Sequence, residues 1–173
     1  MLNHAKLKPE YFTKYLQSNL LAIQSEKGTG KTSNLLEALF NPANNMINDD
    51  SKILFISSRR TFGIKLSADL SQHKFKLYSE IADHHIVARR IICQVDSLLR
   101  LHDSLTFDYV IIDECESLAR YLTSTHFVKN PKASMIVNYL DLRVKEAKYV
   151  YIMDADLSDR CLNYFSKLRE LQP

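Results

Sequence analysis

The chain has 173 residues, 46% of them hydrophobic, which suffices for one ordinary domain with a sizeable core and is too short for two such domains. Its 23 lysines and arginines against 20 aspartates and glutamates give a formal net charge of +3, which permits a nucleic-acid partner without requiring one. The 3 cysteines are widely separated and lack a C-x-x-C spacing, so neither a disulfide framework nor a four-ligand zinc site is indicated. The apolar runs are far shorter than the roughly 20 residues of a membrane span, and the N-terminus carries no secretory segment, so we expect a soluble intracellular protein without a membrane partner.

Short apolar runs alternate along the chain with stretches of helical period, a pattern typical of βαβ units and a mostly parallel sheet. Several of the runs are apolar on both faces, as strands covered by helices on both sides should be. The sequence therefore predicts a three-layer α/β domain. Strands are expected at residues 20–24, 52–57, 75–78, 90–94, 107–113 and 148–153. Helices are expected at residues 31–40, 60–71, 97–102, 115–122, 132–145 and 157–168.

The stretch SEKGTGKT begins at Ser25 and nearly matches the phosphate-binding pattern G-x-x-x-x-G-K-[ST], with serine in place of the first glycine. Gly28 and Gly30 let such a turn point successive N–H groups at phosphate oxygens, at the start of an expected helix. We expect Lys31 to reach the β- and γ-phosphates of ATP and the Thr32 hydroxyl to bind Mg²⁺. The alternative is an ordinary strand-to-helix turn with an exposed lysine. The expected loop residues are Ser25, Gly28, Thr29, Gly30, Lys31, Thr32 and Ser33.

An acidic box, DECES, follows the apolar strand expected at residues 107–113. Asp113 at the end of this strand suits an outer-shell ligand of Mg²⁺, and the neighbouring Glu114 suits a base that accepts a proton from a water attacking the γ-phosphate. The pair favours ATP hydrolysis, with Glu114 and Lys31 as the catalytic residues. The alternative is a helix start decorated with acids because of the helix dipole.

With these two motifs the chain resembles the N-terminal RecA-like ATPase domain of superfamily 2 helicases, and among them the herpesvirus-type origin-of-replication-binding helicases and their relatives in large DNA viruses. The resemblance implies a RecA-like fold, ATP and Mg²⁺ as cofactors, a role in viral DNA replication, and a location in the nucleus or at a cytoplasmic replication site of the host cell. It rests on the segments SEKGTGKT, ILFISSRRTFGIKL, ICQVDSLLRL, YVIIDECESL and YIMDADLSDR.

The resemblance also implies contacts with the backbone of single-stranded or duplex DNA by two segments. Hydroxyl and guanidinium groups at a helix start position a strand and do not read its sequence. The alternative for the first segment is a basic cap on a solvated helix start, and the alternative for the second is an ordinary loop followed by an amphipathic helix. The expected contact residues are Ser58, Arg59, Arg60 and Thr61 in the first segment, and Gln94, Ser97 and Arg100, together with Asp96, in the second.

The segment DADLSD resembles the helicase motif that links phosphate state to nucleic-acid binding. If its strand lies between the phosphate-loop strand and the acidic-box strand, Asp154 emerges close to the γ-phosphate. Which of Asp154, Asp156 and Ser158 senses the phosphate stays open, because Asp156 or Ser158 could instead cap the next helix.

Superfamily 2 helicases bind ATP between two RecA-like domains, so the resemblance implies that residues 1–173 form one half of the cleft and that a second domain, of the same or another chain, is the partner. Alone, the chain is expected to bind Mg·ATP weakly and to hydrolyse it slowly. Two rivals remain: a nucleotide-gated binding module without catalysis, and a P-loop nucleotide or nucleoside kinase whose lid would occupy residues 124–143, with Arg143 as its one arginine. The oligomeric state is not indicated.

Overall fold

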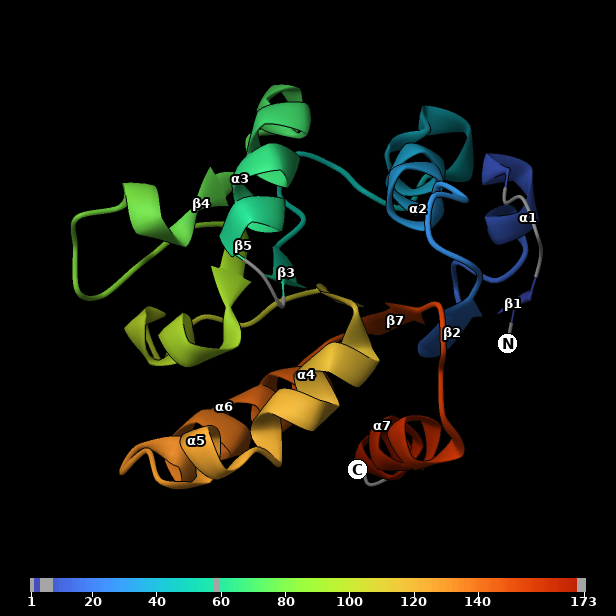
Figure 1. Ribbon diagram of the computed structural model, residues 1–173. Coiled ribbons are helices and arrows are strands. Elements are labelled where there is room, and N and C mark those ends of the chain that lie inside the picture. The colour runs from blue at the N-terminus through green and yellow to red at the C-terminus, as the bar shows by residue number, and fades with distance from the viewer. Residues whose placement is uncertain (1, 4–7, 58–59, 171–173) are drawn as a thin grey trace.

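The computed structural model describes residues 2–3, 8–57 and 60–170, and side chains at 8–57 and 63–170. A seven-stranded sheet with the order β1-β2-β7-β6-β3-β5-β4 forms the centre, and its paired strands are all parallel. Figure 1 shows α1, α2 and α3 on one side of the sheet and α4, α5, α6 and α7 on the other. The expected three-layer α/β architecture with a parallel sheet is therefore confirmed.

The strands are β1 (Leu2–Asn3), β2 (Leu20–Gln24), β3 (Ile53–Ser57), β4 (Lys76–Leu77), β5 (Arg90–Gln94), β6 (Tyr109–Asp113) and β7 (Tyr149–Asp154). The helices are α1 (Pro9–Thr13), α2 (Lys31–Phe40), α3 (Arg60–Asp69), α4 (Cys115–Leu122), α5 (Thr125–Val128), α6 (Ala133–Glu146) and α7 (Asp159–Glu170). In the part of the chain that the structure describes, four 3₁₀ turns join them: η1 (Pro42–Asn44), η2 (Ser71–His73), η3 (Tyr78–Glu80) and η4 (Val95–Arg100). No helix in the described ranges is long and apolar enough to cross a membrane.

The central strands β3 and β6 are buried at every position, which explains their continuous apolar sequences. Each is covered on both faces, since helices pack above and below the sheet (Figure 1). The alternation of strand and helix along the chain produces this arrangement, because each parallel pair needs a crossover connection.

The position of β7 decides where the site forms. β7 lies between β2 and β6, and its register pairs Gln24 with Asp154 and Met153 with Asp113. The carboxyl ends of the three strands therefore lie side by side, and the loops that follow them meet at one edge of the sheet. This is the placement on which the expected position of Asp154 depended.

Some elements differ from the sequence expectation. The helix expected at residues 97–102 is the 3₁₀ turn η4, and the strand expected at 75–78 is only Lys76–Leu77. The six residues of η4 lie directly between β5 and the bridge from Leu101 to Ile86, and short connecting segments often take the tighter 3₁₀ form. β1, α1 and α5 were not foreseen, because elements of two to five residues show no clear hydrophobic period.

Candidate nucleotide-binding site

The phosphate loop joins β2 to α2 and takes its shape from two glycines. Gly28 and Gly30 have φ angles of 81° and 80°, which disfavour residues with a Cβ atom. Within the described chain, positive φ in this loop is confined to these two residues, so Ser25 needs no glycine-like freedom. The Ser25 hydroxyl donates to Thr29 Oγ1 at 2.8 Å, and its N–H donates to the Asp154 carbonyl at 3.2 Å. Serine at the first loop position therefore fits.

Lys31 begins α2 and turns its ammonium group back over the loop. Its Nζ donates to the carbonyl of Ser25 and, at 2.9 Å, to the carbonyl of Glu26. Burial lowers the pKa of Lys31 from its usual value, while the carboxylates of Asp113 and Asp154 act in the opposite direction. No side chain in the described ranges caps the start of α2, so this helix terminus keeps its capacity to bind an anion.

Thr32 and Asp113 meet across the sheet edge, although 81 residues separate them in the chain. The Thr32 hydroxyl donates to Asp113 Oδ2 at 2.6 Å, and Asp113 Oδ1 accepts from the N–H of Glu114 at 2.9 Å. Burial raises the pKa of Asp113, and these two hydrogen bonds act to lower it. The two oxygens that the sequence assigns to Mg²⁺ thus lie in one place.

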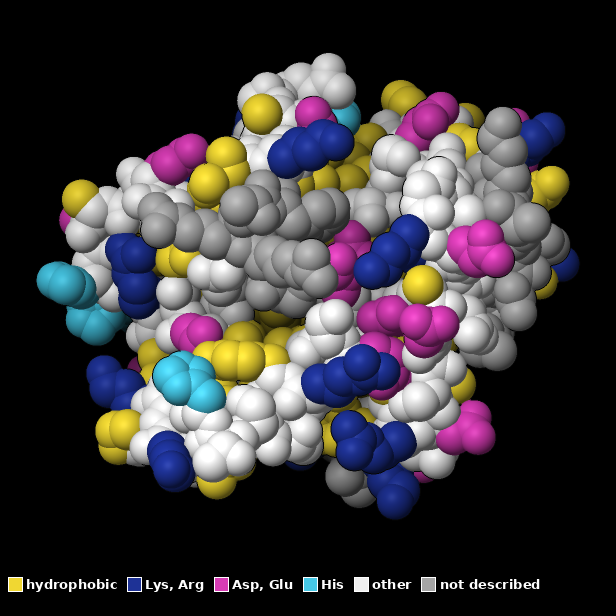
Figure 2. All heavy atoms as spheres, viewed as in Figure 1, with side chains coloured by type: hydrophobic (Ala, Val, Ile, Leu, Met, Phe, Trp, Pro, Cys, Tyr) yellow, Lys and Arg dark blue, Asp and Glu magenta, His cyan; other side chains and the backbone are white. Residues whose placement is uncertain are grey.

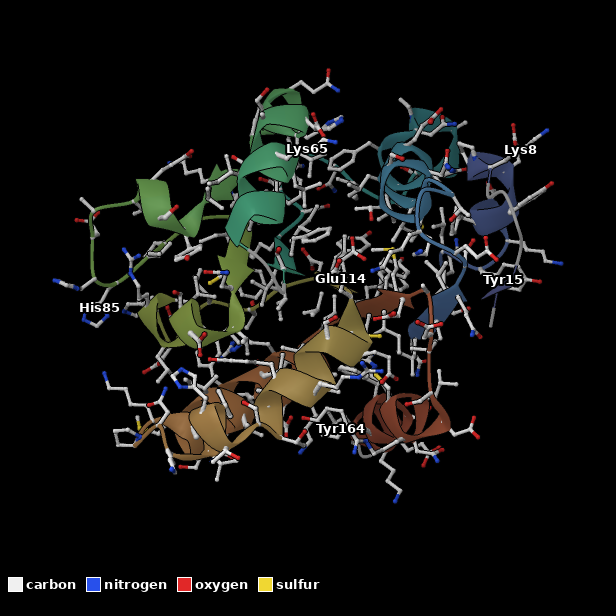
Figure 3. All side chains as sticks on the ribbon, viewed as in Figure 1. Lys8, Tyr15, Lys65, His85, Glu114 and Tyr164 are labelled. Carbon is white, nitrogen blue, oxygen red and sulfur yellow. The ribbon has the colours of Figure 1, made fainter. Side chains whose placement is uncertain are left out.

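Glu114 has a strained backbone at the start of α4. Its φ and ψ of 52° and 48° lie in the left-handed region, which is unusual for a residue other than glycine. Such outliers persist where the surrounding structure holds them, and they cluster at functional sites. The side chain is half-buried and lines a cleft beside Asp113. Figure 3 shows Glu114 near the centre of the molecule, between α3 and α2.

Three hydrogen bonds join the acidic box to the DADLSD segment, and a fourth lies within DADLSD. Asp154 Oδ2 accepts from the N–H of Glu116 at 2.9 Å, and Asp154 Oδ1 accepts from the N–H of Asp156 at 3.1 Å. In return, Glu116 Oε1 accepts from the N–H and the hydroxyl of Ser158 at 2.7 and 2.5 Å. Ser158 Oγ in turn accepts from the N–H of Cys161 at 3.3 Å, so Ser158 caps the helix, as the alternative interpretation held.

A cleft of about 870 Å³ opens over these groups. Figure 2 shows acidic and basic side chains gathered on the face where α2, α4 and the start of α7 meet. One wall of the cleft is α3 and the turn that follows it, which sequence reasoning did not foresee. This wall consists of Lys65, Leu66, Asp69, Leu70, Gln72 and His73. The rest of the lining includes Lys27, Gly28, Gly30, Lys31, Thr32, Ser33, Asp113, Glu114, Glu116, Arg120, Asp154 and Asp156.

Residues 9–172 match the family model described as "Origin of replication binding protein". The chain belongs to this family. Related proteins include the replication origin-binding protein of human herpesvirus 6B, 27% identical over 85% of this chain and 18% of the relative. A putative replication origin-binding protein of Acanthamoeba polyphaga mimivirus is 30% identical over 81% of the chain and 18% of the relative. A putative helicase/primase complex protein of African swine fever virus is 30% identical over 86% of this chain and 14% of the relative.

The chain thus spans less than a fifth of the length of these relatives. Among solved structures, the DEAD box protein of Methanococcus jannaschii aligns with a TM-score of 0.59 at 15% identity, over 95% of this chain and 46% of that one. The Sulfolobus solfataricus SWI2/SNF2 ATPase core, solved with double-stranded DNA, aligns with a TM-score of 0.56 at 18% identity. This alignment covers 88% of this chain and 32% of that one. The chain therefore has the RecA-like fold of these helicase-type structures.

In this family member, the first expected DNA-contacting segment can be located only in part. Ser58 and Arg59 lie outside the described residues. Arg60 and Thr61 begin α3, which follows β3 at the carboxyl edge of the sheet. The expectation for these four residues therefore stays a prediction.

In the second expected segment, the polar side chains of Gln94 and Arg100 form hydrogen bonds within the domain. Gln94 Oε1 accepts from the hydroxyl of Tyr78 at 2.6 Å. The Arg100 guanidinium donates to the carbonyls of Tyr78, Ile81 and Asp83 at 3.2, 2.6 and 3.1 Å. Bonding of this kind favours a structural role for Arg100 and does not support the expected DNA contact. The physical reason is that the guanidinium group supplies three backbone carbonyls with hydrogen-bond donors whose loss would be unfavourable.

Sequence reasoning also missed the role of Glu116. An acid in the first turn of a helix was explained by the helix dipole alone. The structure shows that its side chain, 7% exposed, reaches Ser158 on another element. The available signal was the pairing of one acidic segment with a second one, DADLSD, at the end of a neighbouring strand.

Proposed function

We propose that this domain binds Mg·ATP and forms the first half of the ATP-hydrolysing core of a replication helicase. The observation that carries the proposal is the hydrogen bond of 2.6 Å between Thr32 and Asp113. It brings the end of the phosphate loop and the acidic box together in a cleft that also contains Lys31 and Glu114. An ordinary strand-to-helix turn would not require this meeting.

The residues present fit a nucleotide and a magnesium ion. The loop has two glycines with positive φ, an uncapped helix start and a lysine, as a triphosphate requires. Hydroxyl and carboxylate oxygens are the hard ligands that Mg²⁺ prefers, and Thr32 and Asp113 offer one of each. When bound, the ion would neutralise negative charge on the phosphates.

The chain's own groups have distinct tasks in this proposal. Lys31 exchanges the carbonyls of Ser25 and Glu26 for phosphate oxygens, and the loop N–H groups orient the triphosphate. Glu114 accepts the proton of the water that attacks the γ-phosphate. Asp154 is the proposed phosphate-sensing residue, because its carboxylate bonds both the acidic-box helix and the segment after β7.

A second RecA-like domain and DNA complete the proposal. The relatives carry replication and helicase names and are more than five times as long as the stretch they share with this chain, so a further domain, in the same or another chain, can close the cleft. An arginine supplied by such a domain contributes about 10³ to 10⁵ in rate, so this domain alone should turn over slowly. DNA would bind along Ser58–Thr61 and beside Ser97, by backbone contacts.

The test replaces Glu114 by glutamine. Nucleotide affinity of the domain, measured by titration with Mg·ATP, should change less than about twofold, because glutamine keeps the shape of the side chain. Phosphate release by a protein containing both halves of the cleft should fall by about 10²- to 10⁴-fold. The matched control is Glu37→Gln, an exposed acid that lines the same cleft from α2. Unchanged phosphate release in Glu114→Gln would contradict the proposed base.

One alternative loses support. The kinase interpretation needs a mobile, arginine-bearing lid at residues 124–143, but Arg143 is only 4% exposed and donates to the carbonyls of Leu105 and Asp103. A buried arginine that bonds the backbone is unsuited to reach a phosphoryl group. The nucleotide-gated module without catalysis remains the rival. The Glu114→Gln experiment distinguishes it from the proposed ATP-hydrolysing domain.

A further inference from the structure

The far end of the acidic-box helix α4 is tied to the β5–η4 segment. The Tyr121 hydroxyl donates to both carboxylate oxygens of Asp96, each at 2.8 Å. Within residues 8–57 and 63–170, this is the one pair of residues that joins α4 to η4 by side-chain hydrogen bonds. Tyr121 lies in the last turn of α4, and Asp96 lies in the first turn of η4. The bond therefore joins the helix that begins at the nucleotide site to the second proposed DNA-contacting segment.

The α4 helix is suited to transmit a displacement from one end to the other. At its start, Glu116 accepts two hydrogen bonds from Ser158 and donates its N–H to Asp154. Tyr121 follows five residues later, about 7.5 Å along the axis at about 1.5 Å per residue, within one continuous helix. Its ring packs edge-on against Phe127 at 5.2 Å between centroids, which fixes the direction of the hydroxyl.

The β5–η4 segment is anchored on both sides of Asp96. Gln94 is held by Tyr78, and Arg100 is held by three carbonyls, so Asp96 stands on a short turn with fixed ends. Asp96 is exposed, and its neighbour Ser97 is half-buried. A carboxylate at this position would repel the phosphates of a DNA strand that runs beside Ser97. The hydroxyl of Tyr121 holds that carboxylate toward α4.

We propose that Tyr121 is a positioning residue that couples the nucleotide site to DNA binding by holding or releasing Asp96. The inference rests on the proposed function, because it needs Mg·ATP at the start of α4 and DNA beside η4. A shift of Glu114 and Glu116 toward the γ-phosphate moves α4 and changes the Tyr121–Asp96 distance. The orientation of the Asp96 carboxylate then changes DNA affinity, and by linkage DNA changes nucleotide affinity equally.

The experiment measures the affinity of the complete protein for a single-stranded oligonucleotide, with and without a non-hydrolysable Mg·ATP analogue. The ratio of the two dissociation constants is the coupling factor. Tyr121→Phe removes only the hydroxyl and should reduce this factor by about fivefold, with nucleotide affinity in the absence of DNA unchanged. Asp96→Asn should reduce the coupling factor similarly, because it removes the carboxylate that accepts from the Tyr121 hydroxyl.

The matched control is Tyr164→Phe. The Tyr164 hydroxyl also donates to an aspartate, Asp141, and Tyr164 is likewise half-buried. Figure 3 shows Tyr164 beside α7, on the opposite side of α4 from η4. Its coupling factor should equal that of the unaltered protein.

Each other outcome overturns the inference. An unchanged coupling factor in Tyr121→Phe, or an equal loss in Tyr164→Phe, removes the assigned role of Tyr121. A protein that binds both ligands without coupling leaves the proposed function standing and ends this inference. A protein that binds neither ligand contradicts both. Thermal unfolding of each variant shows that the comparison is between folded proteins.

Discussion

Two regions at the carboxyl edge of the sheet both contain polar side chains, but these side chains lie in different surroundings. Around the phosphate loop, Thr32, Asp113 and Lys31 line an open cleft and bond one another or loop carbonyls. Around η4, Gln94 and Arg100 bond the interior of the domain. Polar side chains in a helicase-like motif therefore do not all face a ligand.

The largest expected effect tests the cleft. Lys31→Ala should lower Mg·ATP affinity on the order of 100-fold, since each charge-assisted hydrogen bond contributes roughly 1.5–3 kcal/mol. The free energy of unfolding of the free domain should change little, because Lys31 is the first residue of α2 and is not part of the hydrophobic core. Isothermal titration with Mg·ATP measures the effect. Lys65→Ala, which removes a charge from the opposite wall of the same cleft, is the control and should change affinity far less.

An equal loss of Mg·ATP affinity in Lys31→Ala and Lys65→Ala would contradict the special role of the phosphate loop in the cleft. It would mean that the cleft attracts the nucleotide through its general charge, without a specific role for the loop.

The next effect tests the η4 region. Arg100→Ala should lower the free energy of unfolding by about 2 kcal/mol, because three carbonyls lose a charged donor. Arg89 serves as control: its ion pair with Asp50 at 2.8 Å is exposed, and its removal should cost at most about 0.5 kcal/mol. Denaturant unfolding measures both. If Arg100→Ala proves as stable as Arg89→Ala, the structural role is wrong and the DNA contact regains support.

The smallest effect is the pH dependence of Asp113. Its pKa is raised in the fold, mainly by burial, so its contribution to stability is complete below the unfolded pKa and is lost as pH rises through the folded one. Without ligand, the stability of the unaltered domain relative to Asp113→Asn should fall from acid toward neutral pH. The effect is small because hydrogen bonds from Thr32 and Glu114 oppose the burial.

Saturating Mg·ATP should reverse this trend, since the ligand stabilises the charged carboxylate. Thermal unfolding at a series of pH values, with and without Mg·ATP, measures it. The same slope in both conditions would show that Asp113 does not meet the ion.

Much of the architecture was predictable from local pattern. β2, β5, α2 and α4 begin and end at the residues expected, because strong periodicity and clear stop signals mark them. Thr32 and Asp113 were each assigned to Mg²⁺ from their motifs, and the structure joins the two by a hydrogen bond. The 3₁₀ form of η4 was not, because its length is set by the neighbouring bridge from Ile86 to Leu101.

The sequence by itself determined the layered α/β class, the phosphate loop and the acidic box, because periodicity and glycine spacing are local properties. Only the tertiary structure decided that Glu116 bonds Ser158, that Arg100 bonds backbone carbonyls, and that α3 walls the cleft. These outcomes depend on which groups the strand order brings within hydrogen-bond distance. Separations of tens of residues carry no sequence pattern, and the need to satisfy buried polar groups is resolved only when the chain is packed.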